Sequence, residues 1–293
     1  MAVAIPEAVL AHFEAFTCYN SPYVAHDDGR AIDLYPGGDR AVSPVAGVVT
    51  AVERVRAPPR PYSPPTDGLL VIDPTGAGGP FDRGDGSTPL ARLLHLEPSV
   101  AVGDAVEVGD DLGGLVRAGF FAPWVPNHLH LGFRPRGADV RRARGSLPLS
   151  LAVDLHPVAW DGRGRVVEAG ETWVELEAPP GVTDAPEAAW VGVAADDGRP
   201  LDGGLPHYRS GGDLWTLQAD PATGQEPVHL LGRRVGTLRG RKLAWEDVTI
   251  EANGVPITGL SLYWATPQRF RPKLICPGHG FEVGERLEVS ITA

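Results

Sequence analysis

Two histidines separated by a single residue are the sharpest chemical signal in the chain. His128 and His130 flank Leu129 in the run HLHLGF. Side chains alternate along a β-strand, so we expect both imidazoles on one face of a strand and Leu129 on the other. Imidazole is a common metal ligand and suits zinc. The pair therefore predicts a metal-binding or catalytic site.

A carboxylate upstream can complete such a site. Asp33 lies in the apolar run AIDLY, residues 31–35, which we expect to form a half-buried strand. A buried carboxylate costs free energy unless it meets a cation or hydrogen-bond donors. The sequence alone leaves two roles open: a metal ligand, or a structural Asp33 bonded to backbone amides or an arginine.

Other histidines are weaker candidates. His95 closes the apolar run ARLLHLEP, and His26 precedes Asp33 in VAHDDGRAID. Taken alone, His95 is better explained as a core or edge histidine and His26 as an exposed loop residue. His207 and His279 lie in Gly-rich runs, where a side chain can approach a ligand closely, although most such histidines are simply exposed.

The order of these features resembles the lysostaphin-type (LytM-like) zinc metalloendopeptidases, peptidoglycan hydrolases with a duplicated hybrid motif fold. That family typically reads H-x3-D, a G-x-V strand, a Y-x-H-L segment, a V-x-x-G-D-x-V turn unit and H-L-H. Here Asp33 is followed by SPVAGVVTAVE, ARLLHLEP, VAVGDAVEVGDDLGG and PNHLHLGF in the same order. The resemblance covers about residues 22–134.

The resemblance implies a ligand set for one Zn²⁺ ion. Asp33 and His130 would be two of the ligands. The family's third ligand is a histidine four residues before the aspartate, and this position is Gly29 here. His26, seven residues before Asp33, is the expected substitute.

The same resemblance implies that His95 and His128 are the two catalytic histidines that do not bind the metal. Zinc lowers the pKa of a bound water from ~15.7 towards ~7, and each acid–base group typically contributes ~100- to 10,000-fold in rate. The expected function is zinc-dependent hydrolysis of a peptide or amide bond. The expected substrate is a peptide or is similar to peptidoglycan.

Two other interpretations remain. The first is a non-catalytic member of the same fold, a binding or scaffold module; it is motivated by Gly29 and by the start MAVAIPEAVLAHFEAF, which lacks an export signal and predicts a cytoplasmic protein. The second is a lipoyl- or biotinyl-type hybrid barrel, which shares the V-G-D turn unit. Such barrels carry a modified lysine in an exposed hairpin. The only lysines here are Lys242 and Lys273, so the N-terminal half, which contains the V-G-D unit, has none, and this interpretation ranks last.

Short strands must position these residues. The chain contains 37 Gly and 29 Pro, which favours strands joined by turns and predicts a mostly β fold. In the first half we expect one helix over residues 6–16, two tight turns within 100–114 and an exposed Pro-rich loop at 57–66. The expected strands are residues 31–35, 45–52, 69–73, 90–96 and 128–133.

A boundary near Pro157 divides the chain into two expected domains, 1–157 and 158–293. The first would be a lysostaphin-like antiparallel β domain. The second would be β-rich and of unknown role, with a sandwich as one arrangement. Its tryptophans, Trp215, Trp245 and Trp264, are expected in the core rather than in a sugar-binding platform. Its expected strands are residues 166–174, 190–194, 214–217, 242–250, 260–265 and 287–291.

Composition excludes several partners. A net charge of -11 argues against nucleic acid or an anionic membrane as a partner. No run reaches the ~18 apolar residues of a membrane span. Cys18 and Cys276 lie far apart and are expected to be separate buried thiols. Oligomeric state cannot be read from the sequence.

Overall fold

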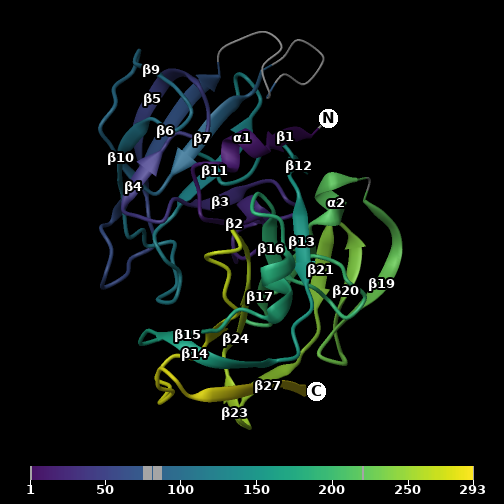
Figure 1. Ribbon diagram of the computed structural model, residues 1–293. Coiled ribbons are helices and arrows are strands. Elements are labelled where there is room, and N and C mark those ends of the chain that lie inside the picture. Colours follow the sequence, from purple (N-terminus) through teal and green to yellow (C-terminus); the bar gives the residue numbers. More distant parts are fainter. Residues whose placement is uncertain (1, 75–80, 82–87, 220, 293) are drawn as a thin grey trace. The chain divides into compact units, whose positions relative to one another are not determined.

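The computed structural model describes residues 2–74, 81, 88–219 and 221–292 (Figure 1). Contacts between Cα atoms divide the chain into two compact units. One comprises Met1–Phe16 and Arg30–Ala152, and the other comprises Thr17–Gly29 and Val153–Ala293. Both consist mostly of β-strands, which confirms the prediction of a mostly β protein with two domains.

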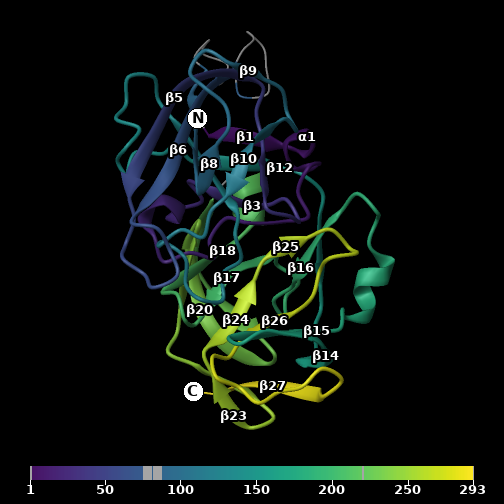
Figure 2. The ribbon, with the colours of Figure 1, turned by 90° about the vertical axis from the view of Figure 1, so that its left-hand side faces the viewer.

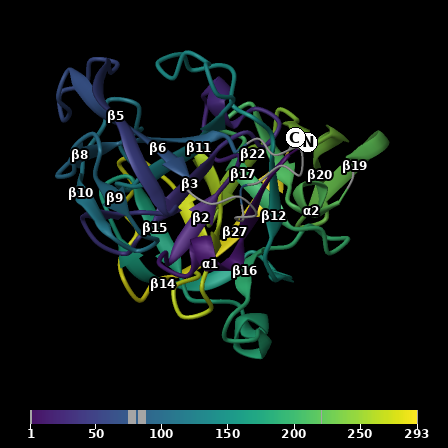
Figure 3. The ribbon, with the colours of Figure 1, turned by 90° about the horizontal axis from the view of Figure 1, so that it is seen from above.

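The first unit is built on an antiparallel sheet. The strand order is β3 (Ile32–Tyr35), β11 (Leu129–Arg134), β7 (Leu90–Leu94), β6 (Thr66–Pro74), β5 (Gly47–Arg56) and β9 (Ala105–Val106). All neighbours in this part of the sheet pair antiparallel. In Figure 3, β5, β6, β11 and β3 follow one another across this sheet.

Smaller elements complete this unit. A three-stranded sheet has the order β4 (Arg40–Val42), β10 (Asp111–Leu115) and β8 (Leu96–Pro98), and β1 (Val3–Pro6) pairs in parallel with β12 (Leu149–Ala152). The helix predicted over residues 6–16 is wrong: α1 (Glu7–Leu10) has four residues, and strand β2 (Ala15–Thr17) follows. A short apolar run does not by itself distinguish a helix from a strand.

Strand β6 is buried on both faces, which explains its continuous apolar run LLVI. On one face Leu69 and Val71 pack with Leu94. On the other face Leu70 and Ile72 are fully buried. Strand β7 directly precedes His95, and β11 contains His130. Both strands therefore lie in the packed centre of the sheet.

The two predicted turns within residues 100–114 are confirmed. Gly103 and Gly109 adopt positive φ angles of 98° and 90°, a conformation that glycine tolerates best. In each turn an aspartate carboxylate accepts a backbone amide three residues earlier, at 2.8 Å in both cases. The predicted loop after β5 is also present, since β6 starts only at Thr66.

The second unit contains a twelve-stranded sheet and a smaller group of strands (Figure 2). Within the described residues the strands of the large sheet do not close into a barrel. The smaller group is β13 (Leu155–Val158), β16 (Trp190–Val193) and β25 (Trp264–Ala265). The large sheet has the order β19 (Ala222–Leu230), β20 (Arg233–Gly240), β21 (Lys242–Trp245), β18 (Ser210–Asp213), β17 (Leu201–Leu205), β24 (Gly259–Leu262), β26 (Lys273–Ile275), β15 (Trp173–Leu176), β14 (Arg163–Ala169), β27 (Arg286–Thr292), β22 (Thr249–Ala252) and β23 (Val255–Ile257).

Three short helices belong to this unit: η1 (Val24–His26), η2 (Pro180–Asp184) and α2 (Trp215–Gln218). The strand predicted over residues 214–217 is wrong, because α2 occupies this segment. The Asp213 carboxylate accepts the Trp215 amide at 2.9 Å, which favours a helix start there. Leu214 and Leu217, three residues apart, are both fully buried.

Cys18 and Cys276 are separate buried thiols, as expected. Among the helices of the described residues, none has the length and apolar character needed to cross a membrane.

Candidate metal centre

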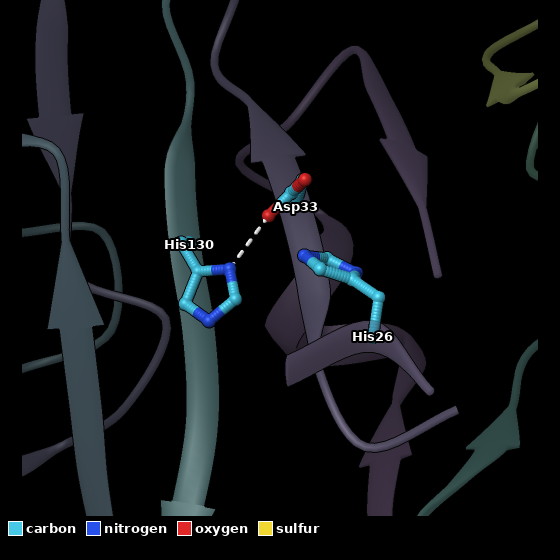
Figure 4. A group of neighbouring side chains, drawn as sticks. All are labelled: His26, Asp33 and His130. Atoms are coloured by element: carbon cyan, nitrogen blue, oxygen red, sulfur yellow. Dashed lines mark hydrogen bonds and ion pairs between the residues drawn. The ribbon is translucent and has the colours of Figure 1, made fainter. Parts of the chain in front are cut away.

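The register of strand β11 brings His130 to Asp33. In the antiparallel pairing of β3 and β11 the two residues are direct partners, and their side chains meet with His130 Nδ1 2.9 Å from Asp33 Oδ1 (Figure 4). The flanking Leu129 and Leu131 are fully buried. The alternation predicted from HLHLGF thus turns one face of β11 to the core and the other to Asp33.

His128 immediately precedes β11 and faces the same carboxylate. Its Nε2 lies 3.3 Å from Asp33 Oδ2, and its Nδ1 lies 3.0 Å from the carbonyl oxygen of Pro126. A carbonyl only accepts hydrogen bonds, so Nδ1 of His128 must carry a proton. Nε2 of His128 is thus the ring nitrogen that faces the Asp33 carboxylate.

His26 supplies a third imidazole. It ends η1, is only 4% exposed, and its Nδ1 lies 2.9 Å from the carbonyl oxygen of Cys18. This bond places the ring proton on Nδ1, so Nε2 is the nitrogen that can act as a metal ligand. The interpretation of His26 as an exposed loop histidine is therefore wrong.

His26, Asp33 and His130 together form a buried group that could hold a metal ion. One ligand atom from each residue lies within 4.8 Å of the others, and Figure 4 shows the three side chains turned toward one another. In tetrahedral zinc sites the ligand atoms are ~2.0–2.1 Å from the ion and hence about 3.3 Å apart. Two nitrogens and one oxygen could hold a metal ion, and the Cys18 carbonyl oxygen lies 2.9 Å from Nδ1 of His26, where metal-bound histidines commonly have an outer partner.

Gly29, where the resembled family has a ligand, has no room for a histidine. Its φ angle is +64°, and a Cβ built there would lie 2.5 Å from Cδ2 of Leu217 and 2.8 Å from the hydroxyl of Tyr19. A side chain there would be strained by the backbone and would require Leu217 and Tyr19 to move. His26, three residues earlier, is the imidazole that lies near Asp33.

His95 lies close to the other histidines but is held by a different carboxylate. Its Nδ1 is 2.5 Å from Oδ2 of Asp67, a residue of β6 whose side chain is fully buried. Its ring centroid lies 5.3 Å from that of His128 and 5.8 Å from that of His130. Burial lowers the pKa of His95, and the negative charge of Asp67 opposes this effect. Because Asp67 accepts the Nδ1 proton, Nε2 presents a lone pair.

Backbone geometry aims His95 at this position. It lies between β7 and β8 with a φ angle of 74°, a left-handed conformation that is uncommon outside glycine. Such residues concentrate at functional sites. His95 is thus not an ordinary continuation of its strand.

Asp67 is the residue that reasoning from the sequence missed. It opens the apolar run DGLLVID, so a buried carboxylate at the start of a strand was the available signal, as it was for Asp33. The following Gly68 permits a close approach, because a Cβ there would lie 1.8 Å from the carbonyl oxygen of Leu96.

Aromatic side chains cover the histidines. The Phe121 ring centroid lies 4.3 Å from that of His128 and 4.6 Å from that of His95. The Tyr62 hydroxyl donates to the Phe121 carbonyl at 2.7 Å, and the Arg117 guanidinium lies 5.1 Å from the Tyr62 ring centroid. The five residues expected to form the site are each 3–5% exposed: His26, Asp33, His95, His128 and His130. Electrostatic interactions in such an enclosed site are strong.

The candidates of the second unit have other environments. His279 uses both ring nitrogens for structure: Nε2 lies 2.8 Å from the Gly170 carbonyl, and Nδ1 accepts the Phe281 amide at 3.1 Å. His207 is partly buried, and burial lowers its pKa to about 4. Neither belongs to the group around Asp33.

The tryptophans follow the expectation only in part. Trp264 is fully buried, and its Nε1 donates to the Leu201 carbonyl at 3.1 Å. Trp245 is partly buried. Trp215 is 44% exposed on α2, so the expectation of a core position is wrong for this residue.

Comparison with known proteins identifies two family domains. Residues 4–151 match a domain of unknown function, the DUF8155 N-terminal domain, and residues 156–292 match the DUF8155 C-terminal domain. No curated protein and no solved structure matches the chain.

Proposed function

The chain belongs to the DUF8155 family, and we propose that it is a zinc-dependent metallopeptidase whose metal ligands are His26, Asp33 and His130. The observation that carries this proposal is the convergence of several imidazoles on one buried carboxylate, with ligand atoms of three residues within 4.8 Å. His128 Nε2 also lies 3.3 Å from the same carboxylate, so imidazoles surround Asp33.

A zinc ion bound there would polarise a substrate carbonyl and lower the pKa of a water molecule. The protein contributes proton transfer through His95 and His128, which the proposal keeps outside the ligand set. His95 Nε2 accepts a proton, and Asp67 stabilises the resulting imidazolium because its carboxylate lies 2.5 Å from Nδ1. Pro126 holds Nδ1 of His128, which orients its Nε2 toward the same space.

The resemblance to lysostaphin-type endopeptidases supports the same roles. It predicted that Asp33 and His130 share an ion and that two further histidines adjoin it. Their proximity was not implied by sequence separation, since Asp33 and His130 are 97 residues apart. The substrate class proposed from this resemblance is a peptide or a peptidoglycan-like peptide.

One observation favours a second candidate, a non-catalytic module of the same fold that binds metal. All five site residues are at most 5% exposed, and Phe121 lies directly over His95 and His128. A substrate could reach the histidines only if this cover moved. A buried metal without an open position would stabilise the fold instead of catalysing hydrolysis.

Zinc stoichiometry and peptide hydrolysis, measured together, test the proposal. We expect one zinc per chain in the wild type and none in Asp33→Ala or His130→Ala. His95→Ala and His128→Ala should retain zinc and lose hydrolysis of a peptide library. Stoichiometric zinc without hydrolysis in the wild type would select the non-catalytic module, and a wild type that binds no zinc would refute both.

A further inference from the structure

We propose that Asp202, far away in the sequence, is a positioning residue for the metal ligand His26. The inference rests on the metal centre proposed above. Residues 17–29, which include His26, belong by their contacts to that unit. Asp202 lies on β17 of its large sheet, and its side chain is fully buried.

Asp202 binds three consecutive residues of the His26 segment. Its Oδ1 accepts the Thr17 hydroxyl at 2.5 Å and the Tyr19 amide at 2.9 Å, and its Oδ2 accepts the Cys18 amide at 3.0 Å. Hydrogen bonds to an ionised acceptor are shorter and stronger than neutral ones. The carboxylate therefore clamps the backbone at residues 17–19.

The clamped residue Cys18 in turn holds His26. Its amide donates to Asp202, and its carbonyl oxygen lies 2.9 Å from His26 Nδ1. The bond to the carbonyl keeps the proton on Nδ1 and leaves Nε2 for the ion. The orientation and the tautomer of this ligand thus depend on where Asp202 places one peptide unit.

The segment needs such a clamp because it has little regular structure of its own. Between β2 and β3 it contains only the three-residue η1, and Asp28 and Gly29 adopt positive φ angles of 58° and 64°. By contrast, Asp33 and His130 lie on paired strands. Metal ligands have to be held within about 0.5 Å of their working positions. Strand pairing fixes the positions of Asp33 and His130, and the hydrogen bonds of Asp202 fix the backbone that holds His26.

Replacement by the isosteric amide tests the inference. In Asp202→Asn the side chain keeps one acceptor oxygen but turns an NH₂ group toward a backbone amide, so at least one of the three bonds is lost. We expect the affinity for Zn²⁺, measured by competition with a chromophoric chelator, to fall about 10- to 100-fold, the range for outer residues of metal sites. The visible absorption of the Co²⁺-loaded protein should also change, because a displaced His26 alters the coordination.

Asp213 provides a matched control. It lies on the adjacent strand β18, is also buried, and accepts one backbone amide, that of Trp215. Among the interactions described for the Asp213 side chain, none involves residues 17–29. Asp213→Asn should therefore lower the free energy of unfolding about as much as Asp202→Asn does. Its Zn²⁺ affinity should stay within about twofold of the wild type, and its Co²⁺ spectrum should match that of the wild type.

A second pair of variants serves if Asp202→Asn does not fold. Thr17→Val removes one donor to Asp202, and Thr17→Ser keeps it. We expect weaker zinc binding in the valine variant and recovery in the serine variant. Affinities and Co²⁺ spectra that match the wild type in Asp202→Asn or Thr17→Val would overturn the role of Asp202, whereas a wild type that binds no zinc would overturn the metal centre itself.

Discussion

Two regions of this protein bury charged groups, and they neutralise them differently. In the second unit Lys273 is 9% exposed, lies 3.8 Å from the Glu175 carboxylate and sits over the Trp173 ring at 4.3 Å. This lysine meets a carboxylate within the chain. The Asp33 carboxylate has imidazole partners, at 2.9 Å for His130 and 3.3 Å for His128.

This difference separates a structural ion pair from a candidate metal centre. Imidazoles are cations only when protonated, and near neutral pH they serve chiefly as neutral ligands. We propose that a metal cation completes the Asp33 group, whereas Lys273 and Glu175 pair with each other. Metal, pH and substitution should affect the two regions differently, and four expectations follow from this.

The largest expected effect is the stabilisation of the wild type by zinc. At a free zinc concentration about 1,000 times the Kd, binding to the folded state adds roughly 4.1 kcal/mol to the free energy of unfolding. Chemical denaturation with zinc and with a chelator measures this difference. Asp33→Ala should remove the effect, while Asp39→Ala, at an exposed position, should keep it. An unchanged zinc response in Asp33→Ala would contradict the contrast between the regions.

The second expectation concerns His207, a partly buried histidine of the second unit. Burial lowers the pKa of His207 to about 4, below the value of about 6.5 in the unfolded chain. Between these values the unfolded state binds more protons, so stability rises as pH increases from 4 to 6.5 and is lost as pH falls through 4. The full contribution is up to roughly 3.4 kcal/mol.

Denaturation of the wild type and His207→Gln across this pH range measures the contribution. The difference in free energy of unfolding between the two proteins should grow in favour of the wild type as pH rises. His229→Gln, at an exposed histidine of the same unit, serves as the control. A His207→Gln profile parallel to that of the wild type would show that His207 does not titrate in this window.

The third expectation tests the pair in the second unit. Lys273→Met removes the buried cation that lies 3.8 Å from the half-buried Glu175 carboxylate, which costs up to about 3 kcal/mol, the lower end for breaking a buried pair. The other lysine, Lys242, is 44% exposed beside Asp27, so Lys242→Met should change stability by less than about 0.5 kcal/mol. Equal effects of the two substitutions would mean that Lys273 is not a structural cation.

The smallest expected effect concerns Asp67. Asp67→Asn keeps an acceptor for His95 Nδ1 but removes the negative charge that stabilises a protonated ring. Hydrolysis should fall about 10- to 100-fold in kcat, with zinc stoichiometry and KM little changed. Asp73→Asn, on the same strand and paired with Arg136, is the matched control. Loss of zinc in Asp67→Asn would contradict this role and would indicate that Asp67 is needed for metal binding.

Local patterns in the sequence were enough to predict the elements of this protein. Alternation in HLHLGF predicts a strand that turns Leu129 and Leu131 to the core and His130 to the opposite face, and the spaced V-G-D units predict the two turns. These features depend on neighbouring residues and on backbone preferences alone. Short apolar runs were ambiguous, which is why residues 6–16 and 214–217 adopt other structures than predicted.

Only the tertiary structure decided which residues meet. The register between β3 and β11 sets His130 beside Asp33, the collision at Gly29 leaves His26 as the third imidazole, and Asp67 reaches His95 across β6 and β7. Asp202, 185 residues from Thr17, clamps the segment that carries His26. Such contacts arise from strand pairing and packing between distant parts of the chain, and no local pattern in the sequence encodes them.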